Sequence, residues 1–376
     1  VATTPICPAS AFADGVAAFR ERFATAPVGT GPFRVAAWTP GDRIELTRHA
    51  GWWGGSSPLD GVTIHFIADR TAMAEGMRRG EIDVALGTGG DWDGAGDPLA
   101  DLAEIAVARQ PTRTWHHLDL KQLDFLLETP VRQALDLAIP RDRIFADLLH
   151  GRGIPATADQ SPANWAFASD LAPRPHDPAQ AASLLDEAGL TANDDGVRAR
   201  DGQPFVLEVW SVQGDARSGA IADAVAAAWR DLGIVVPRKA ADPATLWGPL
   251  GYQFSDAMTA CIYAWTNGND PDDRYYWHSS QIPPSPSGQG GNLPAFFHPY
   301  AFQQQIDDLI DQGIATFSLG KRQDIYGDIQ HLLADETPVI FLFWEESFPA
   351  VGPRLQGCQP HPYAGLLWNA GTWRVV

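Results

Sequence analysis

The side chains best suited to contact a bound molecule are aromatic. The chain has 14 tryptophans among 376 residues, and Trp210, Trp247 and Trp265 lie near the predicted ends of strands, with Tyr263 just before Trp265. Flat aromatic rings provide a large contact area at low entropic cost and tolerate ligands of varied shape. We therefore expect these four residues to line a ligand-binding surface, and packing in a hydrophobic core is the alternative for each of them.

Four polar residues complete the predicted ligand-binding set. Asn267 and Asn269 follow Trp265 in the segment NGNDPDD. Arg217 is at the start of the predicted helix that follows Trp210. His117 follows His116 in a predicted strand, where successive side chains point to opposite faces. The two imidazoles therefore cannot easily share one metal ion, and we expect one to face a cleft and the other to lie in the core.

The motifs of common metal, cofactor and catalytic sites are missing from the sequence. Segment 267–273 has no glycine at the sixth position of a calcium-binding loop, and no glutamate follows at the twelfth. The sequence also has no G-x-S-x-G, H-E-x-x-H or P-loop motif. Gly29-Thr30-Gly31 is followed by Pro32 and a predicted strand, so a dinucleotide-binding turn is not expected. The sequence predicts a protein that is not an enzyme, with no catalytic residue, no metal ligand and no cofactor.

Charge and composition narrow the class of partner. The formal net charge is −19 and 45% of the residues are hydrophobic, which favours a well-packed acidic protein over a disordered one. A strongly acidic chain repels nucleic-acid phosphates and anionic lipids, so neither is an expected partner. The sequence contains no apolar run long enough to span a membrane, and its three cysteines are too few for a disulfide scaffold.

The predicted elements alternate between strands and helices, which is typical of an α/β architecture. The predicted helices span residues 11–23, 71–79, 130–138, 141–149, 178–188, 217–232, 301–313 and 319–334. The predicted strands span residues 33–38, 43–47, 62–67, 82–86, 114–120, 205–210, 234–236, 257–265 and 338–344.

Residues 27–71 carry the most specific pattern in the chain. They run PVGTGPFRVAAWTPGDRIELTRHAGWWGGSSPLDGVTIHFIADRT, and this order resembles the solute-binding proteins of bacterial ABC importers in the peptide/nickel/opine class. The matching positions are Gly29, Thr30, Gly31, Pro32, Phe33, Trp38, Trp52, Trp53, Gly54, Gly55, Leu59 and Asp60. A match over many linked positions is more specific than any single short motif.

The resemblance continues in order along most of the chain. The segments VRQAL at 131–135, HDP at 176–178, LGI at 232–234 and DPD at 270–272 each match a motif of that family. The residues at 5–8 resemble a segment that family members carry in mid-chain. We therefore expect this sequence to lack the N-terminal region of the family.

The resemblance implies a two-lobed fold of the periplasmic-binding-protein type, similar to class II, with mixed sheets flanked by helices. Residues 1–120 and 347–376 would form lobe I, in partial form, and residues 121–346 would form lobe II. A hinge would lie at the two crossings, near Leu120 and Glu346, and the ligand would bind between the lobes and favour their closure.

The same resemblance implies a function: capture of a peptide or similar polar solute outside the cell or in the periplasm, and delivery to ABC permease subunits. Peptide binders of this family commonly place a carboxylate shortly after the equivalent of Trp265, but here Gly or Asn fills that position. This departure weakens the case for a dipeptide. The alternatives are a carbohydrate- or metal-chelate-binding protein of the same fold, a truncated fragment that binds nothing, and a hydrolase with paired carboxylates.

Overall fold

The computed structural model describes residues 9–13, 15–88, 104–283 and 290–376. The chain divides into two compact units, one formed by residues 1–110 and 347–376 and the other by residues 111–346. Strands β6 (Gln110–Leu120) and β14 (Val339–Val351) contain the two positions at which the chain passes from one unit to the other. The predicted assignment of the lobes, with a hinge at these crossings, stays a prediction.

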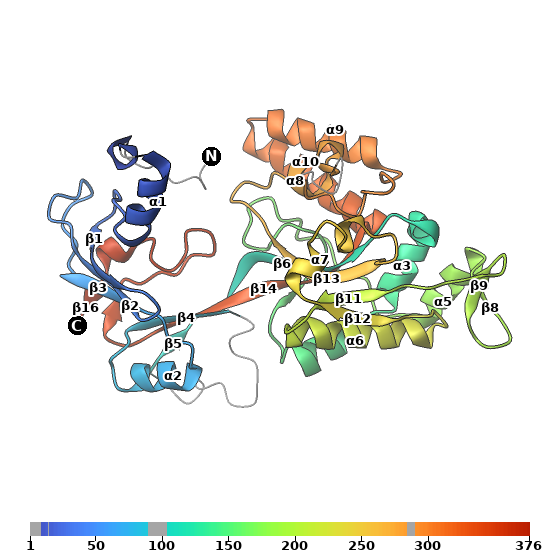
Figure 1. Cartoon of the computed structure of the whole chain (residues 1–376), viewed down its shortest axis with the longest axis horizontal. Helices are drawn as coiled ribbons and strands as arrows, with labels where there is room; N and C mark the ends of the chain where they lie inside the picture. Colours follow the sequence, from blue (N-terminus) through green and yellow to red (C-terminus); the bar gives the residue numbers. More distant parts are fainter. Residues whose placement is uncertain (1–8, 14, 89–103, 284–289) are drawn as a thin grey trace. The chain divides into compact units, whose positions relative to one another are not determined.

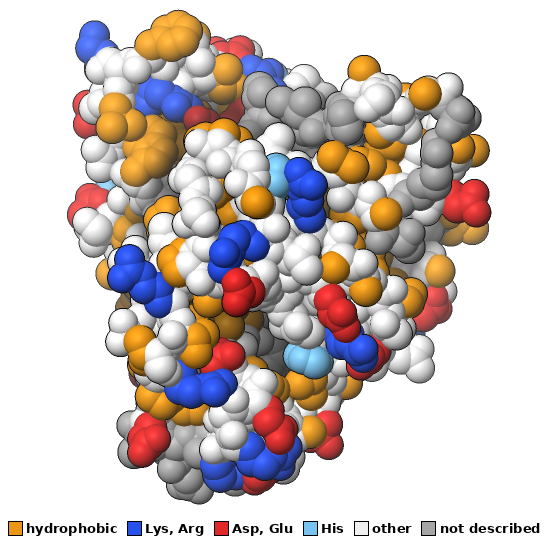
Figure 2. All heavy atoms as spheres, turned by 90° about the vertical axis from the view of Figure 1, so that its left-hand side faces the viewer, with side chains coloured by type: hydrophobic (Ala, Val, Ile, Leu, Met, Phe, Trp, Pro, Cys, Tyr) orange, Lys and Arg blue, Asp and Glu red, His pale blue; other side chains and the backbone are white. Residues whose placement is uncertain are grey.

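The first unit is built around a three-stranded antiparallel sheet of β1 (Phe33–Thr39), β2 (Arg43–Arg48) and β3 (Gly61–His65), in that order. Helix α1 (Gly15–Thr25) follows a short 3-10 turn at Ala9–Phe12. None of the residues in β1–β3 is buried. The left-hand side of Figure 1, where these strands lie, faces the viewer in Figure 2, and hydrophobic side chains are visible there between scattered basic and acidic ones.

Helix α2 (Arg70–Arg78) shows how local residues define an element in this unit. Asp69 caps its first turn, because the carboxylate accepts hydrogen bonds from the backbone N–H groups of Thr71 and Ala72 at 2.8 and 3.1 Å. Gly80 follows the helix with a φ of 69°, a conformation that glycine adopts without steric cost. The remaining strands of the unit are β4 (Val84–Thr88), β5 (Ala106–Val107), β15 (Leu355–Gln356) and β16 (Arg374–Val375).

The second unit contains most of the larger sheet, in which β12 (Arg238–Ala241), β11 (Val209–Val212), β13 (Ala260–Thr266), β6 and β14 are neighbours in that order. The end of β14 that belongs to the first unit pairs with β4 and β5. Strand β11 is parallel to β12 and β13, whereas β13 and β6 are antiparallel. The sheet is therefore mixed, as the α/β class predicted. Shorter strands are β7 (Ile154–Pro155), β8 (Thr191–Ala192), β9 (Arg198–Arg200) and β10 (Gln203–Pro204).

Helices cover both faces of this sheet (Figure 1). On one face, α3 (Thr129–Leu137), α5 (Pro178–Glu187) and α6 (Ala216–Asp231) pack on a core that includes Leu118 and Ile262. On the other, α8 (Arg274–Trp277), α9 (Gln303–Ala315) and α10 (Leu319–Glu336) pack on a core that includes Trp115 and Phe341. The short elements are α4 (Arg141–Arg143), α7 (Pro243–Leu246) and the turns Asp124–Leu127, Tyr252–Phe254, Ser279–Gln281 and Ala370–Thr372.

Three predicted elements differ from the structure. The strand expected at 234–236 forms only an isolated bridge between Val206 and Val235, and the sheet strand is β12, at Arg238–Ala241. The strand expected at 205–210 enters the sheet only at Val209, as β11. The helix expected at 141–149 is a short α4 followed by a π-helical turn over Ile144–Leu148. None of the helices in the described ranges combines the length and apolar character that a membrane span needs.

Candidate ligand-binding site

The pairing of β6 with β13 brings two of the predicted aromatic residues, Tyr263 and Trp265, to one face of the larger sheet. Tyr263 lies opposite His117, and Trp265 lies opposite Trp115. Because residues two apart in a strand share a face, these four rings form one continuous surface. The ring centroids are 4.3 Å apart for His117 and Tyr263, 5.8 Å for Tyr263 and Trp265, and 4.5 Å for Trp115 and His117.

Rings from two other elements extend this surface. Trp247, at the end of α7, meets Tyr263 edge to face at 5.0 Å, and Tyr275 of α8 meets Trp265 in the same way at 5.6 Å. Trp247 is 39% exposed and Tyr275 is 47% exposed, while Tyr263 and Trp265 are half-buried. We call Trp247, Tyr263, Trp265 and Tyr275 the aromatic wall.

Tyr275 was not predicted from the sequence. It belongs to the run RYYW at 274–277, directly after the DPDD segment, and its neighbour Tyr276 packs 5.2 Å from Trp265. The run forms a single helical turn. The sequence of one turn does not indicate which of its rings will contact a strand distant in the chain.

Trp210 lies beside the wall rather than in it. Its strand β11 pairs with β13 so that Trp210 is opposite Cys261, on the same face as Tyr263. With Tyr263 it packs on a small core that includes Tyr252 and Leu246, and its indole N–H donates to Glu208 at 2.9 Å.

The two predicted asparagines have different surroundings. Asn267 is buried, its amide N–H donates to the backbone oxygen of Asp159 at 2.8 Å, and its amide oxygen accepts from the indole of Trp115 at 2.6 Å. Both ends of this side chain are thus used to position neighbouring residues. Asn269 is exposed and accepts from the Arg113 guanidinium at 2.8 Å.

Arg217 lies on the opposite face of the sheet from the aromatic wall. Its guanidinium is 5.9 Å from the ring of Phe343 and 3.4 Å from a carboxylate oxygen of Glu345. The imidazole of His116 stacks on the same phenylalanine at 4.3 Å. The structure therefore does not bring Arg217 together with the tryptophans.

Both neighbouring histidines are buried, and the expectation that one of them faces a cleft stays a prediction. His117 shares the face of the wall, but Tyr263 and Trp115 pack against it and it is almost fully covered. Burial lowers the pKa of His116 to about 3 and holds the pKa of His117 well below its usual range. Both rings are therefore neutral at physiological pH.

A buried polar group lies under the wall. The hydroxyl of Tyr263 donates to Asp119 at 2.9 Å, and burial raises the pKa of this carboxyl group to about 7. The ammonium of Lys121 donates to the backbone oxygens of Tyr252 and Ser255 and lies 4.4 Å from the Tyr252 ring centroid. Burial lowers the pKa of Lys121 to about 8.

A second buried pair supports the loop after Trp265. Asp159 accepts from the Trp277 indole at 2.7 Å, and Asp273 accepts from the Gln160 amide. Burial raises the pKa of both carboxyl groups, and the neighbouring Asp159 raises that of Asp273 further. Within the described ranges, no group of three or more histidine, cysteine, aspartate or glutamate side chains could hold a metal ion.

Comparisons with known proteins agree with this architecture. The family model of bacterial extracellular solute-binding proteins, family 5 Middle, matches residues 2–283. The oligopeptide-binding protein AppA of Bacillus subtilis is 25% identical over 354 residues, which cover 92% of this chain and 62% of AppA. Heme-binding protein A of Haemophilus influenzae is 23% identical over 363 residues, which cover 91% of this chain and 59% of that protein.

Solved structures show the same fold. The structure of Bacillus subtilis AppA in complex with a nonapeptide aligns with a TM-score of 0.71 at 23% identity, covering 99% of this chain and 72% of that one. The chain spans about three fifths of the length of the curated relatives it matches, given the 62% and 59% above. On the family model and the shared fold, the chain belongs to the bacterial extracellular solute-binding proteins of family 5.

Proposed function

We propose that this chain acts as the solute-binding component of an ABC importer and holds a peptide-like solute against the aromatic wall. The observation that carries the proposal is the wall itself: four rings from β13, α7 and α8 in continuous contact, two of them substantially exposed. Such a surface suits an occupant with varied side chains. The relative AppA, which is named as an oligopeptide-binding protein, and the nonapeptide in its structure support a peptide.

The charges near the wall favour a ligand without a deeply held amino terminus. Asp270 forms a two-pronged ion pair with Arg322 at 2.6 and 3.0 Å, and Asp272 accepts from the backbone N–H of Arg274 at 3.0 Å. Asp273 is buried in its pair with Asp159. The carboxylates after Trp265 thus have partners within the chain. The amino-terminal ammonium of a ligand buried beside them would therefore lack a negative charge to compensate its own. A peptide longer than two residues fits this arrangement better than a dipeptide.

In this proposal the chain works outside the cytoplasm, in the periplasm or at the cell surface, as its family description implies. It passes the solute to permease subunits and does not alter it chemically.

Trp265→Ala tests the proposal directly. Removing a ring that stacks on the ligand should weaken binding of a peptide from a pooled library by about 1–3 kcal/mol. The melting temperature should fall little, because the ring is only half-buried. Binding is measured by isothermal titration calorimetry, and mass spectrometry of the recovered peptide should show it unchanged.

Phe317→Ala is the matched control. Phe317 lies between α9 and α10, outside the wall, and is 99% exposed, so its loss should leave affinity as it is. Unaltered affinity in a folded Trp265→Ala protein would show that this ring only fills the core. A cleaved peptide would instead indicate a hydrolase.

A further inference from the structure

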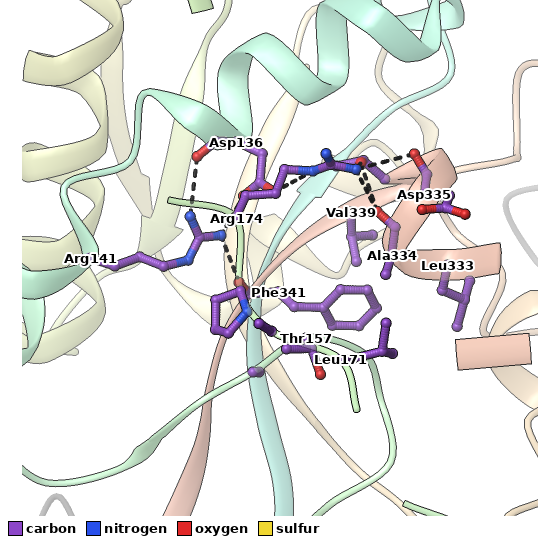
Figure 3. A pocket seen from close by; sticks show the side chains of 14 residues that line it. Asp136, Arg141, Thr157, Leu171, Arg174, Leu333, Ala334, Asp335, Val339 and Phe341 are labelled. Atoms are coloured by element: carbon purple, nitrogen blue, oxygen red, sulfur yellow. Dashed lines mark hydrogen bonds and ion pairs between the residues drawn. The ribbon is translucent and has the colours of Figure 1, made fainter. Parts of the chain in front are cut away.

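A small cavity lies within the second unit (Figure 3), and none of the residues that line it belongs to the aromatic wall. It encloses about 150 Å³ between the end of α3, the segment after β7, residues 171–174, the end of α10 and the start of β14. Pockets for drug-sized ligands usually measure about 300–1,000 Å³, so this one suits a molecule of only a few heavy atoms.

Two arginines meet at this cavity around a single buried carboxylate. Figure 3 shows Asp136 between the side chains of Arg141 and Arg174. Arg141 donates to one carboxylate oxygen of Asp136, and the Nε of Arg174 lies 3.2 Å from the other. A terminal nitrogen of Arg174 also donates to the backbone oxygen of Ala334 at 2.7 Å. Asp335 lines the cavity too, but its side chain is exposed to solvent. One buried carboxylate therefore compensates two guanidinium groups.

Hydrogen-bond donors at the cavity are left without an acceptor. The Nε of Arg141 and the hydroxyl of Thr157 are both buried and have no hydrogen-bond partner, and the two residues are only 8% and 9% exposed. The Nε of Arg174 makes the ion pair with Asp136 but no well-aligned hydrogen bond. A buried donor without a partner costs about 1–3 kcal/mol, so a molecule that accepts hydrogen bonds is favoured here.

Thr337 also lines the cavity, and the remaining side chains of the lining are apolar. Leu171 and Pro173 lie in the segment that closes the cavity, and Leu333, Val339 and Phe341 come from α10 and β14. Water could satisfy the donors, but it gains nothing from this apolar surface. A molecule with an anionic head and a short apolar tail uses both parts of the lining.

We propose that this cavity binds a short-chain carboxylate, with its head on Arg141, Arg174 and Thr157 and its tail against Leu171 and Phe341. Guanidinium groups hold carboxylates through charge-assisted hydrogen bonds, which are stronger than neutral ones. The site is separate from the aromatic wall, and this assignment does not depend on the proposed peptide binding.

The experiment titrates the full chain with butyrate, with butyramide as the neutral isostere and acetate as the shorter acid, at constant ionic strength. Calorimetry and the chemical shift of carboxyl-labelled butyrate report binding. Butyrate should bind saturably and more tightly than acetate, and butyramide should bind much more weakly. Thr157→Val and Arg174→Gln should each weaken butyrate binding by about ten-fold or more, the effect of losing a charge-assisted hydrogen bond.

Arg143→Gln is the control, because Arg143 is an exposed arginine of the neighbouring α4 and does not line the cavity. It should leave butyrate binding unchanged.

Circular dichroism melts confirm that each variant is folded. If Arg174→Gln does not fold, Thr157→Val still tests the proposal, because valine preserves the side-chain volume of threonine. Equal binding of butyrate and butyramide, or undiminished binding by folded Thr157→Val, would overturn the proposal and leave the cavity as a water site. None of these variants should affect peptide affinity. The proposal of carboxylate binding in the cavity can therefore be disproved without affecting the proposal of peptide binding at the aromatic wall, and the reverse is also true.

Discussion

Asp119 couples the protein's stability to pH through one buried carboxyl group. Its pKa is about 7 in the folded protein because burial disfavours the charged form, whereas an unfolded aspartate has a pKa of about 3.9. Between about pH 4 and pH 7 the folded state therefore holds a proton that the unfolded chain has released. The contribution of this group to stability falls as the pH rises through that window and is constant above it.

Asp119→Asn should remove this contribution to the pH dependence. The neutral amide can still accept the hydrogen bond that Tyr263 donates to Asp119. The variant should be more stable than the original protein at pH 8, and the difference should shrink as the pH approaches 4. Urea unfolding at several pH values measures this, with the exposed Asp194→Asn as control. An unchanged pH profile would mean that another group holds the proton.

The buried pair of Asp159 and Asp273 makes a related prediction. Both carboxyl groups have a raised pKa through burial, and Asp159 raises the pKa of Asp273 further. Asp273→Asn replaces one acid by an amide that can accept the same hydrogen bond from Gln160. The melting temperature should rise at neutral pH, where the pair is most unfavourable, and the gain should vanish under acid. A lower melting temperature at pH 7 would show that the carboxylate itself is needed.

Among the elements, α9 and α10 approach each other closely at one glycine of α9. A Cβ atom at Gly313 would lie 2.9 Å from the ring of Tyr326, which is fully buried. Gly313→Ala should therefore destabilise the protein by about 1–3 kcal/mol, the usual effect of overpacking. Chemical denaturation of the full chain measures the change in unfolding free energy.

A second glycine in the same helix pair provides the matched control. Gly327 lies inside α10, and a Cβ atom there would meet no atom within 4 Å. Gly327→Ala should stabilise the protein by about 0.5–1 kcal/mol, since alanine restricts the unfolded chain and favours the helix. If both substitutions destabilised the protein, the expected gain from helix propensity would be wrong, and the packing argument for Gly313 would stand.

At the scale of the whole molecule, the two units differ in how well their sheets are covered. Strands β6 and β13 include Leu118, Leu120 and Ile262, which are fully buried, whereas no residue of β1–β3 is buried. Local opening is easiest where few apolar side chains are buried. Hydrogen exchange followed by mass spectrometry should show much faster exchange in β1–β3 than in β6 and β13. Equal protection would mean that the smaller sheet gains stability from contacts other than its own side chains.

Sequence reasoning succeeded where an element's ends depend on its own residues. The helix expected at 71–79 is α2, at Arg70–Arg78, because a capping aspartate and a terminal glycine define it locally. The strand β12 was missed because its four residues include Arg238 and Lys239 and only one buried side chain. It is a strand because it pairs with β11, and such pairing leaves no local signal.

The sequence by itself determined the α/β class and the family. The alternation of strand and helix patterns indicates the class, and many linked motifs, readable in order along the chain, indicate the family. Only the tertiary structure decided which residues share a surface. The register of β6 with β13 places Trp265 and Tyr263 on one face, and the attachment of α6 places Arg217 on the other. Alternation along a strand can be read locally, but the face that each helix covers depends on contacts between residues distant in the chain.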